Sequence, residues 1–342
     1  MGEAWLYIGF ITFVIVMLVL DLGVFHRHAK EIGVKQALAW TAFWVSLALL
    51  FIPIVYLIWH NNWFGMADHA DTVFKTPRPL SPKEAMLAFI SGYLIEESLS
   101  LDNVFVIALI LTYFGVPGKY QHRVLFWGIV GAVCLRGIMI AAGAALVHRF
   151  SWMNYVFGSI LLLTTIKLMR SGDDEIDLDK NPVVRFARRF LPVTSSIHGE
   201  KFFIHLDGRR HVTPLFIALL VVEFTDVIFA VDSIPAIFGV TTIPFIVFTS
   251  NIFAILGLRS LYFALAAMMR LFRYLKTSLV FLLGFVSIKL LIANFYHINV
   301  YVSLGVILTI LGSGIAASLI LKEKEEIAPT EPTPVESAVG EE

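Results

Sequence analysis

The sequence predicts an all-α polytopic membrane protein with about nine transmembrane helices, an inverted 3+3 helix repeat at its core and a small cytoplasmic insertion. Three observations indicate this fold class. Of 342 residues, 58% are hydrophobic and only 15% are charged, against ~25% charged residues in soluble domains. Long apolar runs recur along the chain, and two stretches share polar landmarks at nearly equal spacing. The charges of the 26 basic and 26 acidic residues cancel. The net charge therefore gives no indication that nucleic acid is a partner.

Apolar runs of about 20 residues, long enough to cross the hydrocarbon core of a bilayer, define the predicted spans. They cover residues 4–24, 37–59, 85–113, 124–147, 151–169, 214–239, 244–269, 277–297 and 300–321. No basic residue precedes the first run, so we interpret it as a permanent span and not as a signal peptide. A single cysteine excludes an intrachain disulfide.

The basic residues of the loops predict the orientation in the membrane. With the N-terminus outside, 18 lysines and arginines fall in cytoplasmic loops and four fall in outer loops. We therefore expect a multi-pass protein of the bacterial inner (plasma) membrane, with its N-terminus outside and its C-terminus in the cytoplasm.

The expected organisation follows the chain in order. Residues 1–60 form two peripheral transmembrane helices, 61–84 an extracytoplasmic loop and 85–169 the first three-helix repeat. Residues 170–213 form a cytoplasmic loop, in which an Asp-Gly pair between β-type residues predicts a β-hairpin. The second, inverted repeat occupies 214–297, the last transmembrane helix 298–322 and a disordered cytoplasmic tail 323–342. The acidic run at 173–179 is either a solvated linker or a metal sensor.

The internal repeat is indicated by three polar landmarks in each half. These are Asp102, Arg136 and Lys167 in the first half and Asp226, Arg259 and Lys289 in the second. The steps between them are 34 and 31 residues in the first half, and 33 and 30 in the second. Units of three spans must face opposite ways across the membrane, as in many secondary transporters whose sites lie at the repeat interface.

Acidic residues inside the membrane mark the candidate site. Seven fall within predicted spans. Six of these lie on only two spans, three on the first span of each repeat. A charged side chain costs ~2.5–3.5 kcal/mol at the centre of a membrane helix, so such acids indicate function. The predicted metal ligands are Glu96, Asp102, Glu223, Asp226 and Asp232. Supporting roles are expected for Asn103, Ser233, Glu97 and the carbonyl of Val231, which Pro235 deprives of its helical partner.

The chemistry of these side chains predicts the kind of cation. No histidine falls in the middle of a span, and an all-oxygen site suits Mn²⁺, Ca²⁺ or Mg²⁺. Arg136, Lys167, Arg259 and Lys289 are expected to pair with some of the acids. Acids left without a base would hold protons when the site is empty, which suggests exchange of metal for protons. A proton path or buried salt bridges without a metal is the open alternative.

Four motifs resemble the TerC family of bacterial membrane proteins, named for tellurium resistance. They are GYLIEESLSLDNVF (92–105), EFTDVIFAVDSIPAIF (223–238), TSNIFAILGLRSLYF (249–263) and DGRRHVTP (207–214). The resemblance covers most of the chain from about Leu18 to Leu321. It implies kinship with LysE-type exporters and export of Mn²⁺, in some members to supply secreted enzymes. The family's acidic residues match the five predicted ligands, whereas Glu97 stands where relatives carry lysine.

Residues and resemblance together predict a secondary transporter, and not an enzyme, that exports divalent metal cations from the cytoplasm by proton exchange. Mn²⁺ is the first candidate for the transported ion, Ca²⁺ and Mg²⁺ remain open, and no tightly bound cofactor is expected. The alternative is an assembly, insertion or metalation factor that acts on membrane or secreted partners without transport of its own. Chloroplast relatives implicated in thylakoid protein insertion motivate it, and a direct role in tellurite resistance is left open.

Overall fold

The computed structural model describes residues 2–20, 34–73, 77–150, 152–170, 192–194, 199–206, 209–266, 275–292, 295–296 and 298–320. Its helices are α1 (Gly2–Leu20), α2 (Val34–His60), α3 (Pro82–Tyr113), α4 (Gly118–Arg149), α5 (Met153–Arg170), α7 (Pro214–Phe238), α8 (Pro244–Ala266), α9 (Leu275–Ile292) and α10 (Val300–Ile320). Within the described residues, a helix overlaps each predicted span. The acidic run at 173–179 and the tail 323–342 lie outside the described residues.

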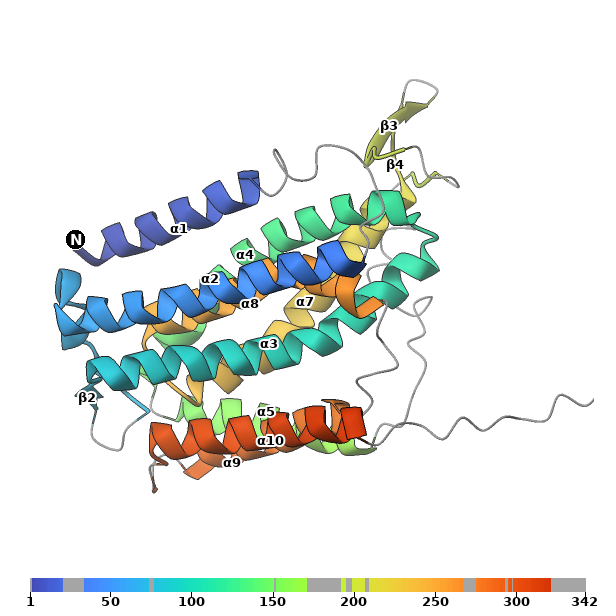
Figure 1. Ribbon diagram of the computed structural model, residues 1–342. Helices are drawn as coiled ribbons and strands as arrows, with labels where there is room; N and C mark the ends of the chain where they lie inside the picture. The colour runs from blue at the N-terminus through green and yellow to red at the C-terminus, as the bar shows by residue number, and fades with distance from the viewer. Residues whose placement is uncertain are drawn as a thin grey trace, which may run out of the picture.

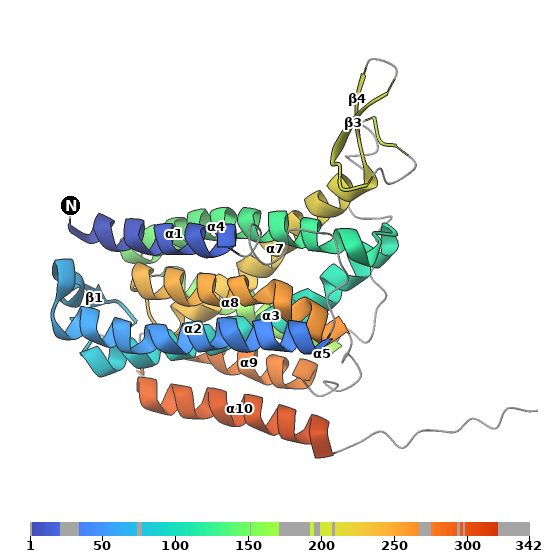
Figure 2. The same ribbon diagram turned by 45° about the horizontal axis from the view of Figure 1, so that its top comes forward.

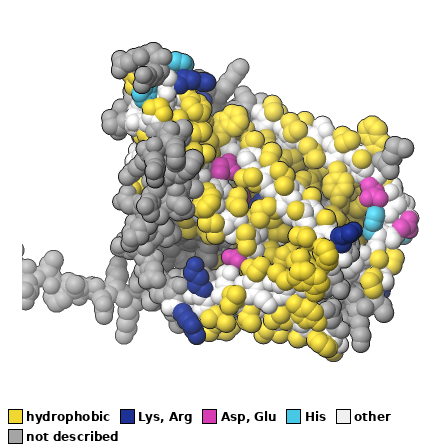
Figure 3. Space-filling model, turned by 180° about the vertical axis from the view of Figure 1, so that it is seen from behind, with side chains coloured by type: hydrophobic (Ala, Val, Ile, Leu, Met, Phe, Trp, Pro, Cys, Tyr) yellow, Lys and Arg dark blue, Asp and Glu magenta, His cyan; other side chains and the backbone are white. Residues whose placement is uncertain are grey.

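Hydropathy identifies the chain as a multi-pass membrane protein. Six of the described helices are long and apolar enough to cross a bilayer, namely α1, α2, α4, α7, α8 and α10. The apolar stretches of α5 and α9 are shorter, and α3 carries Glu96, Glu97 and Asp102 near its middle. Large apolar side chains point outward, as in Ile138 (68% exposed) and Phe281 (65%). The face in Figure 3 is largely apolar, with charged side chains mostly toward its two ends.

The start of α3 shows how the chain enters the membrane. Ser81 caps the helix, Pro82 occupies its first turn, and the side chain of Glu84 accepts a hydrogen bond from the backbone N–H of Ser81. Arg78 donates two hydrogen bonds to the Glu84 carboxylate, at 3.0 and 2.6 Å. The 32 residues of α3 extend ~48 Å at 1.5 Å per residue, farther than the ~30 Å hydrocarbon core. The helix is therefore long enough to cross the core and to extend beyond it.

The core of the fold lies around α8, which is almost wholly buried. Helix α8 packs against α2, α3 and α4, while α7 packs against α3, α4 and α5. Helix α5 packs against α9, and α10 covers α9 and α3. Helix α1 lies at the outside of the bundle (Figure 1) and inserts Phe10 among Phe51, Phe245 and Phe253.

The two ends of the bundle carry different small elements. The 3₁₀ helix η2 (Trp63–Asp68) and the paired strands β1 (Ala70–Asp71) and β2 (Arg78–Pro79) lie at the end where α1 begins (Figures 1 and 2). Strands β3 (Phe203–Leu206) and β4 (Arg209–Val212) pair antiparallel and project from the opposite end. Leu206 pairs with Arg209, so the hairpin has the two-residue connection that the Asp-Gly pair predicts.

A buried carboxylate anchors the loop between α2 and α3. The Asp71 side chain is 1% exposed and accepts hydrogen bonds from the hydroxyls of Thr241 and Thr242 and from the backbone N–H of Thr242 and Val73. Because Thr241 and Thr242 lie between α7 and α8, Asp71 fastens the loop over the turn that joins these two helices. The N-terminal end of the bundle is therefore closed by a specific polar contact.

Candidate functional site

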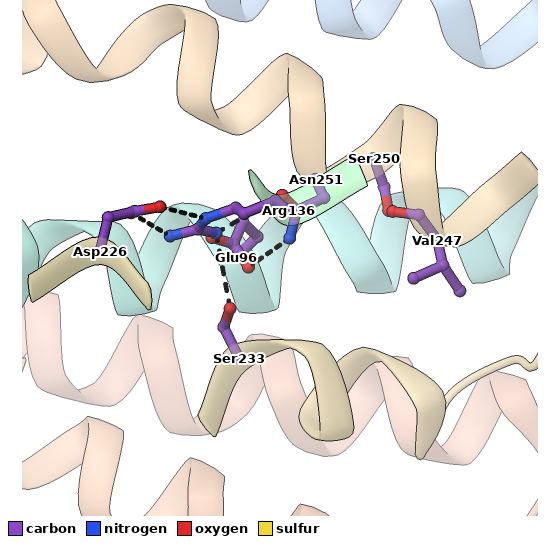
Figure 4. A network of polar contacts seen from close by, with 7 residues as sticks. All are labelled: Glu96, Arg136, Asp226, Ser233, Val247, Ser250 and Asn251. Atoms are coloured by element: carbon purple, nitrogen blue, oxygen red, sulfur yellow. Dashed lines mark hydrogen bonds and ion pairs between the residues drawn. The ribbon is translucent and has the colours of Figure 1, made fainter. Parts of the chain in front are cut away.

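A buried arginine lies at the centre of the bundle between two carboxylates (Figure 4). Arg136 of α4 donates from Nε and Nη2 to the two carboxylate oxygens of Asp226 on α7, at 3.1 and 2.7 Å. Its Nη1 is ion-paired with Oε1 of Glu96 on α3. The side chains of Arg136 and Glu96 are at most 1% exposed, and that of Asp226 is 17% exposed. Three helices thus meet at one guanidinium.

Two neutral side chains complete this group. The Asn251 amide on α8 donates to Oε2 of Glu96 at 2.9 Å, and its Oδ1 lies 3.4 Å from Nη1 of Arg136. Ser233 Oγ on α7 lies 3.5 Å from the same nitrogen. Both residues are at most 2% exposed. We call Glu96, Arg136, Asp226, Ser233 and Asn251 the central polar group.

The central polar group carries an excess of negative charge. Two carboxylates face one guanidinium, which leaves a formal charge of −1 in a largely buried region. Buried charges are stable only when they are paired and hydrogen-bonded. The arginine offsets one carboxylate and its neighbours supply hydrogen bonds. Glu223 beside Asp226 and Arg259 in the adjoining cavity add one charge of each sign, so the balance stays at −1, and this negative charge is what the site offers to a cation or a proton.

A small cavity lies beside the central polar group. Arg136 and Asp226 line it together with Gly128 and Ala132 of α4 and with Arg259 of α8. Its volume of about 20 Å³ suffices for one water molecule, which needs ~10–15 Å³. The lining residues Gly128 and Ala132 precede Arg136 in α4, so the cavity extends from the site toward the hairpin end of the bundle.

The structure brings two of the five predicted ligands together, places Glu223 near enough to Asp226 for their charges to repel, and leaves Asp232 apart. Glu96 and Asp226 meet at Arg136, whereas Asp232 accepts a hydrogen bond from Thr164 of α5 at 2.8 Å. Glu223 packs so closely against Gly131 of α4 that a Cβ there would overlap its carboxylate. The side chain of Asp102 lies outside the described residues.

Convergence of all five ligands on one point is therefore not seen among the described residues. These contain no group of three or more His, Cys, Asp or Glu side chains placed to hold a metal ion. The reason is geometric. Asp226 and Asp232 are six residues apart, ~120° around a helix; α7 continues through Pro235, and Asp232 stays directed toward α5. Metal binding by these residues stays a prediction.

The supporting residues have different surroundings. Ser233 belongs to the central polar group, and Asn103 is buried on α3 at 4% exposure. The Val231 side chain is 43% exposed and faces away from the site. Tyr93 lies beside Glu97, whose Oε2 is buried without a hydrogen-bond partner among the described residues. Glu97 is therefore separate from the central polar group.

The four intramembrane bases also occupy different places. Arg136 pairs with two acids, as the sequence predicts. Lys167 lies close enough to Asp232 for their charges to attract. Lys289 is buried, donates to Ser303 of α10 at 3.0 Å and is attracted by Asp71. Arg259 is 2% exposed and lines the cavity.

Sequence reasoning missed Asn251, although it is the residue that joins α8 to the site. Its signal is weak, because Asn251 follows Thr249 and Ser250, whose hydroxyls satisfy their own helix by bonding to backbone carbonyls. Polar side chains of that kind are common in membrane helices. Only the facing Glu96 distinguishes the amide from its neighbours.

Comparisons with known proteins agree with the motifs. The family model described as integral membrane protein TerC family matches residues 81–326. An uncharacterized membrane protein of Myxococcus xanthus, STKORF319, is 50% identical over 96% of this chain and 95% of its own length. Proteins named putative membrane-bound redox modulator Alx are 45% identical in Salmonella typhi and 46% in Escherichia coli K12, each over 91% of this chain and 92% of the relative. No solved structure matches the chain. This chain belongs to the TerC family of integral membrane proteins.

Proposed function

We propose that the chain is a secondary transporter that exports divalent metal cations, Mn²⁺ first among them, from the cytoplasm in exchange for protons. The observation that carries this proposal is the excess negative charge of the central polar group, buried where four helices meet. Carboxylate, hydroxyl and amide oxygens are the donors that Mn²⁺, Mg²⁺ and Ca²⁺ prefer. Unbalanced acids inside a membrane protein typically belong to ion pathways or proton relays.

The packing of the helices supports an inverted repeat. If α3, α4 and α5 correspond to α7, α8 and α9, then the contact of α3 with α8 has its counterpart in the contact of α4 with α7, and both are extensive. The contacts α3–α7, α4–α8 and α5–α9 each join a helix to its own equivalent. The central polar group takes Glu96 and Arg136 from one unit and Asp226, Ser233 and Asn251 from the other. A site between repeats is typical of secondary transporters.

The proposed orientation places the hairpin β3–β4 and the loop before it in the cytoplasm. The basic residues of the loops favour this side, and the inner bacterial membrane is the corresponding location. The cavity beside Arg136 then extends toward the cytoplasm, which is the side from which an exporter takes its ion. The hydrogen bonds that Asp71 accepts from Thr241 and Thr242 would then lie at the outer end of the bundle.

The test is ion flux into proteoliposomes that contain the purified full-length protein. An imposed pH gradient should drive Mn²⁺ transport, and Ca²⁺ and Mg²⁺ are compared under the same gradient. Asp226→Asn and Asp102→Asn should each abolish transport while the protein remains folded in the membrane. The matched control is Asp68→Asn in η2, at the outer end, which should transport normally. Unchanged flux in both Asp226→Asn and Asp102→Asn would exclude these acids as the ion site.

A second function, assembly of partner membrane proteins, is favoured by the projecting hairpin. Phe203 and Leu206 are 45% and 41% exposed at its surface, and the hairpin stands clear of the helices (Figure 2). Replacing residues 203–212 by a flexible linker tests this role. An assembly factor loses its activity in cells, whereas a carrier of this design retains flux in proteoliposomes.

A further inference from the structure

We propose that Arg136 is an internal cation, which occupies the ion site of the empty carrier and which an incoming divalent cation must displace. This inference rests on the proposed export function and assigns to one residue the selectivity of that site. Arginine is a cation and cannot itself bind a metal. Because Arg136 lies between the oxygen atoms that would bind the metal, it competes with the metal for them.

The oxygen atoms around the guanidinium are those that a hard divalent cation would use. Glu96 and Asp226 supply carboxylate oxygens, Ser233 a hydroxyl and Asn251 an amide oxygen, and each lies within 3.5 Å of a guanidinium nitrogen. Mn²⁺ and Mg²⁺ take about six oxygen ligands and bind to proteins through one or two carboxylates plus water. Arg136 therefore stands at the focus of a ligand set that is otherwise suited to a metal ion (Figure 4).

Charge arithmetic gives the divalent ion its advantage over the arginine. The two carboxylates with Arg136 have a formal charge of −1, whereas the same carboxylates with a divalent cation are neutral. A monovalent ion would bring the site to −1, no better than Arg136 does. Arg136 also holds Asp226 by two parallel hydrogen bonds, the strongest geometry that a guanidinium offers. The arginine thus excludes monovalent cations and yields to divalent ones.

The displaced side chain has a direction in which to move. Side chains on an α-helix lean toward its N-terminus, and for Arg136 this is the hairpin end of α4. Gly128 and Ala132, which lie on that side, leave the small cavity that Arg136 already lines. The cavity is lined mainly by apolar side chains, with Asp226 and Arg259 as its other polar residues, and it must widen to take the guanidinium. Withdrawal along this path clears the space between Glu96 and Asp226.

Arg136 also stabilises the carrier when no metal ion is bound. Without it, an empty site would hold two uncompensated carboxylates, and burying unpaired charge is strongly unfavourable. With Arg136 in place, the empty site keeps close contacts between α3, α4 and α7. Release of the metal is thereby coupled to the return of the arginine, which competes for the same oxygens.

The first experiment measures Mn²⁺ binding to purified full-length protein by isothermal titration calorimetry. Arg136→Gln should lower the dissociation constant at least tenfold and should slow Mn²⁺ flux in proteoliposomes, because the competitor that promotes release is gone. The matched control is Arg123→Gln on the same helix, whose ion pair with Glu200 is partly exposed. It should bind and transport like the unmodified protein. Size-exclusion chromatography and circular dichroism verify folding.

A chemical competitor provides the second experiment and does not depend on one variant. In Arg136→Ala, added guanidinium ions should weaken Mn²⁺ binding competitively, and they should leave binding to the unmodified protein unchanged. Arg136→Lys, which keeps the charge without the planar fork, replaces Arg136→Gln if the latter does not fold, and it should bind more tightly than the unmodified protein.

The outcomes separate the two proposals. If the unmodified protein binds no divalent cation and carries no flux, the proposed function fails. If it binds Mn²⁺ but the folded Arg136 variants bind it equally or more weakly, and guanidinium does not compete, then Arg136 only positions the acids and the present inference is overturned while the export function stands.

Discussion

The excess negative charge of the central polar group predicts an asymmetry between its acid and base. In Glu96→Gln the side chain still accepts a hydrogen bond from Arg136 and the formal charge falls from −1 to zero, but an amide nitrogen replaces the oxygen that accepts from Asn251. The free energy of unfolding should therefore fall by only ~1–3 kcal/mol. In Arg136→Gln two carboxylates lose the base that pairs with both of them, and removing one partner of a buried ion pair costs ~3–5 kcal/mol. The double variant returns to a charge of −1 and should recover part of that loss.

The assay is reversible unfolding in mixed detergent and SDS micelles, followed by circular dichroism for the two single variants and the double variant. Arg123→Gln is the control, because its pair with Glu200, at 3.2 Å, is formed by side chains 35% and 38% exposed. Such a pair contributes at most ~1 kcal/mol. If Glu96→Gln destabilises the protein as much as Arg136→Gln does, the group holds no uncompensated charge and the reasoning is refuted.

Three further predictions concern individual contacts. Gly131→Ala forces the Glu223 carboxylate to move, but this carboxylate ends a flexible side chain and alanine favours the helix by ~1 kcal/mol over glycine, so the free energy of unfolding should change by at most ~1 kcal/mol in the same unfolding assay. Arg78 lowers the pKa of Glu84 from 4.5 to about 2. Because the pKa is lower in the folded protein than in the unfolded one, the ion pair stabilises the folded state fully above about pH 4.5. This stabilisation is lost as the pH falls from about 4.5 toward 2. Glu84→Gln should flatten this part of the pH dependence of the melting temperature. Asp71→Asn leaves buried hydroxyl and backbone donors poorly matched and should cost ~1–3 kcal/mol, with faster proteolysis of the loop before α3 as the measurable sign.

The helices and the central acids were predictable because the physical signals are strong. Apolar runs of about 20 residues in a chain with so few charges are typical of membrane spans. A carboxylate in lipid costs enough that Glu96 and Asp226 had to be functional or paired. The hairpin was also predictable, because a two-residue Asp-Gly connection restricts the backbone strongly.

The parts that could not be predicted depend on which helices become neighbours. The spacing along α7 fixes the angle between Asp226 and Asp232, but it does not tell which helix Asp232 faces, and the answer is α5 and not the site. Asn251 was missed for the same reason, because an amide in an apolar helix has meaning only once Glu96 is opposite it. Asp71 falls in a loop, where a carboxylate is usually solvated, and its burial arises from the threonines between α7 and α8.

The placement of the central polar group also implies how ion binding and conformational change are linked. Arg136 belongs to the first proposed repeat and Asp226 to the second, so any rocking of one repeat against the other must separate them or carry them together. Moving a two-state equilibrium from 1:99 to 99:1 requires ~5.5 kcal/mol of differential affinity. Separating Arg136 from Asp226 without replacing its charge would leave a buried carboxylate unpaired, which costs ~3–5 kcal/mol. A divalent cation that takes the place of Arg136 removes this cost, so its binding favours the state in which the two residues are apart.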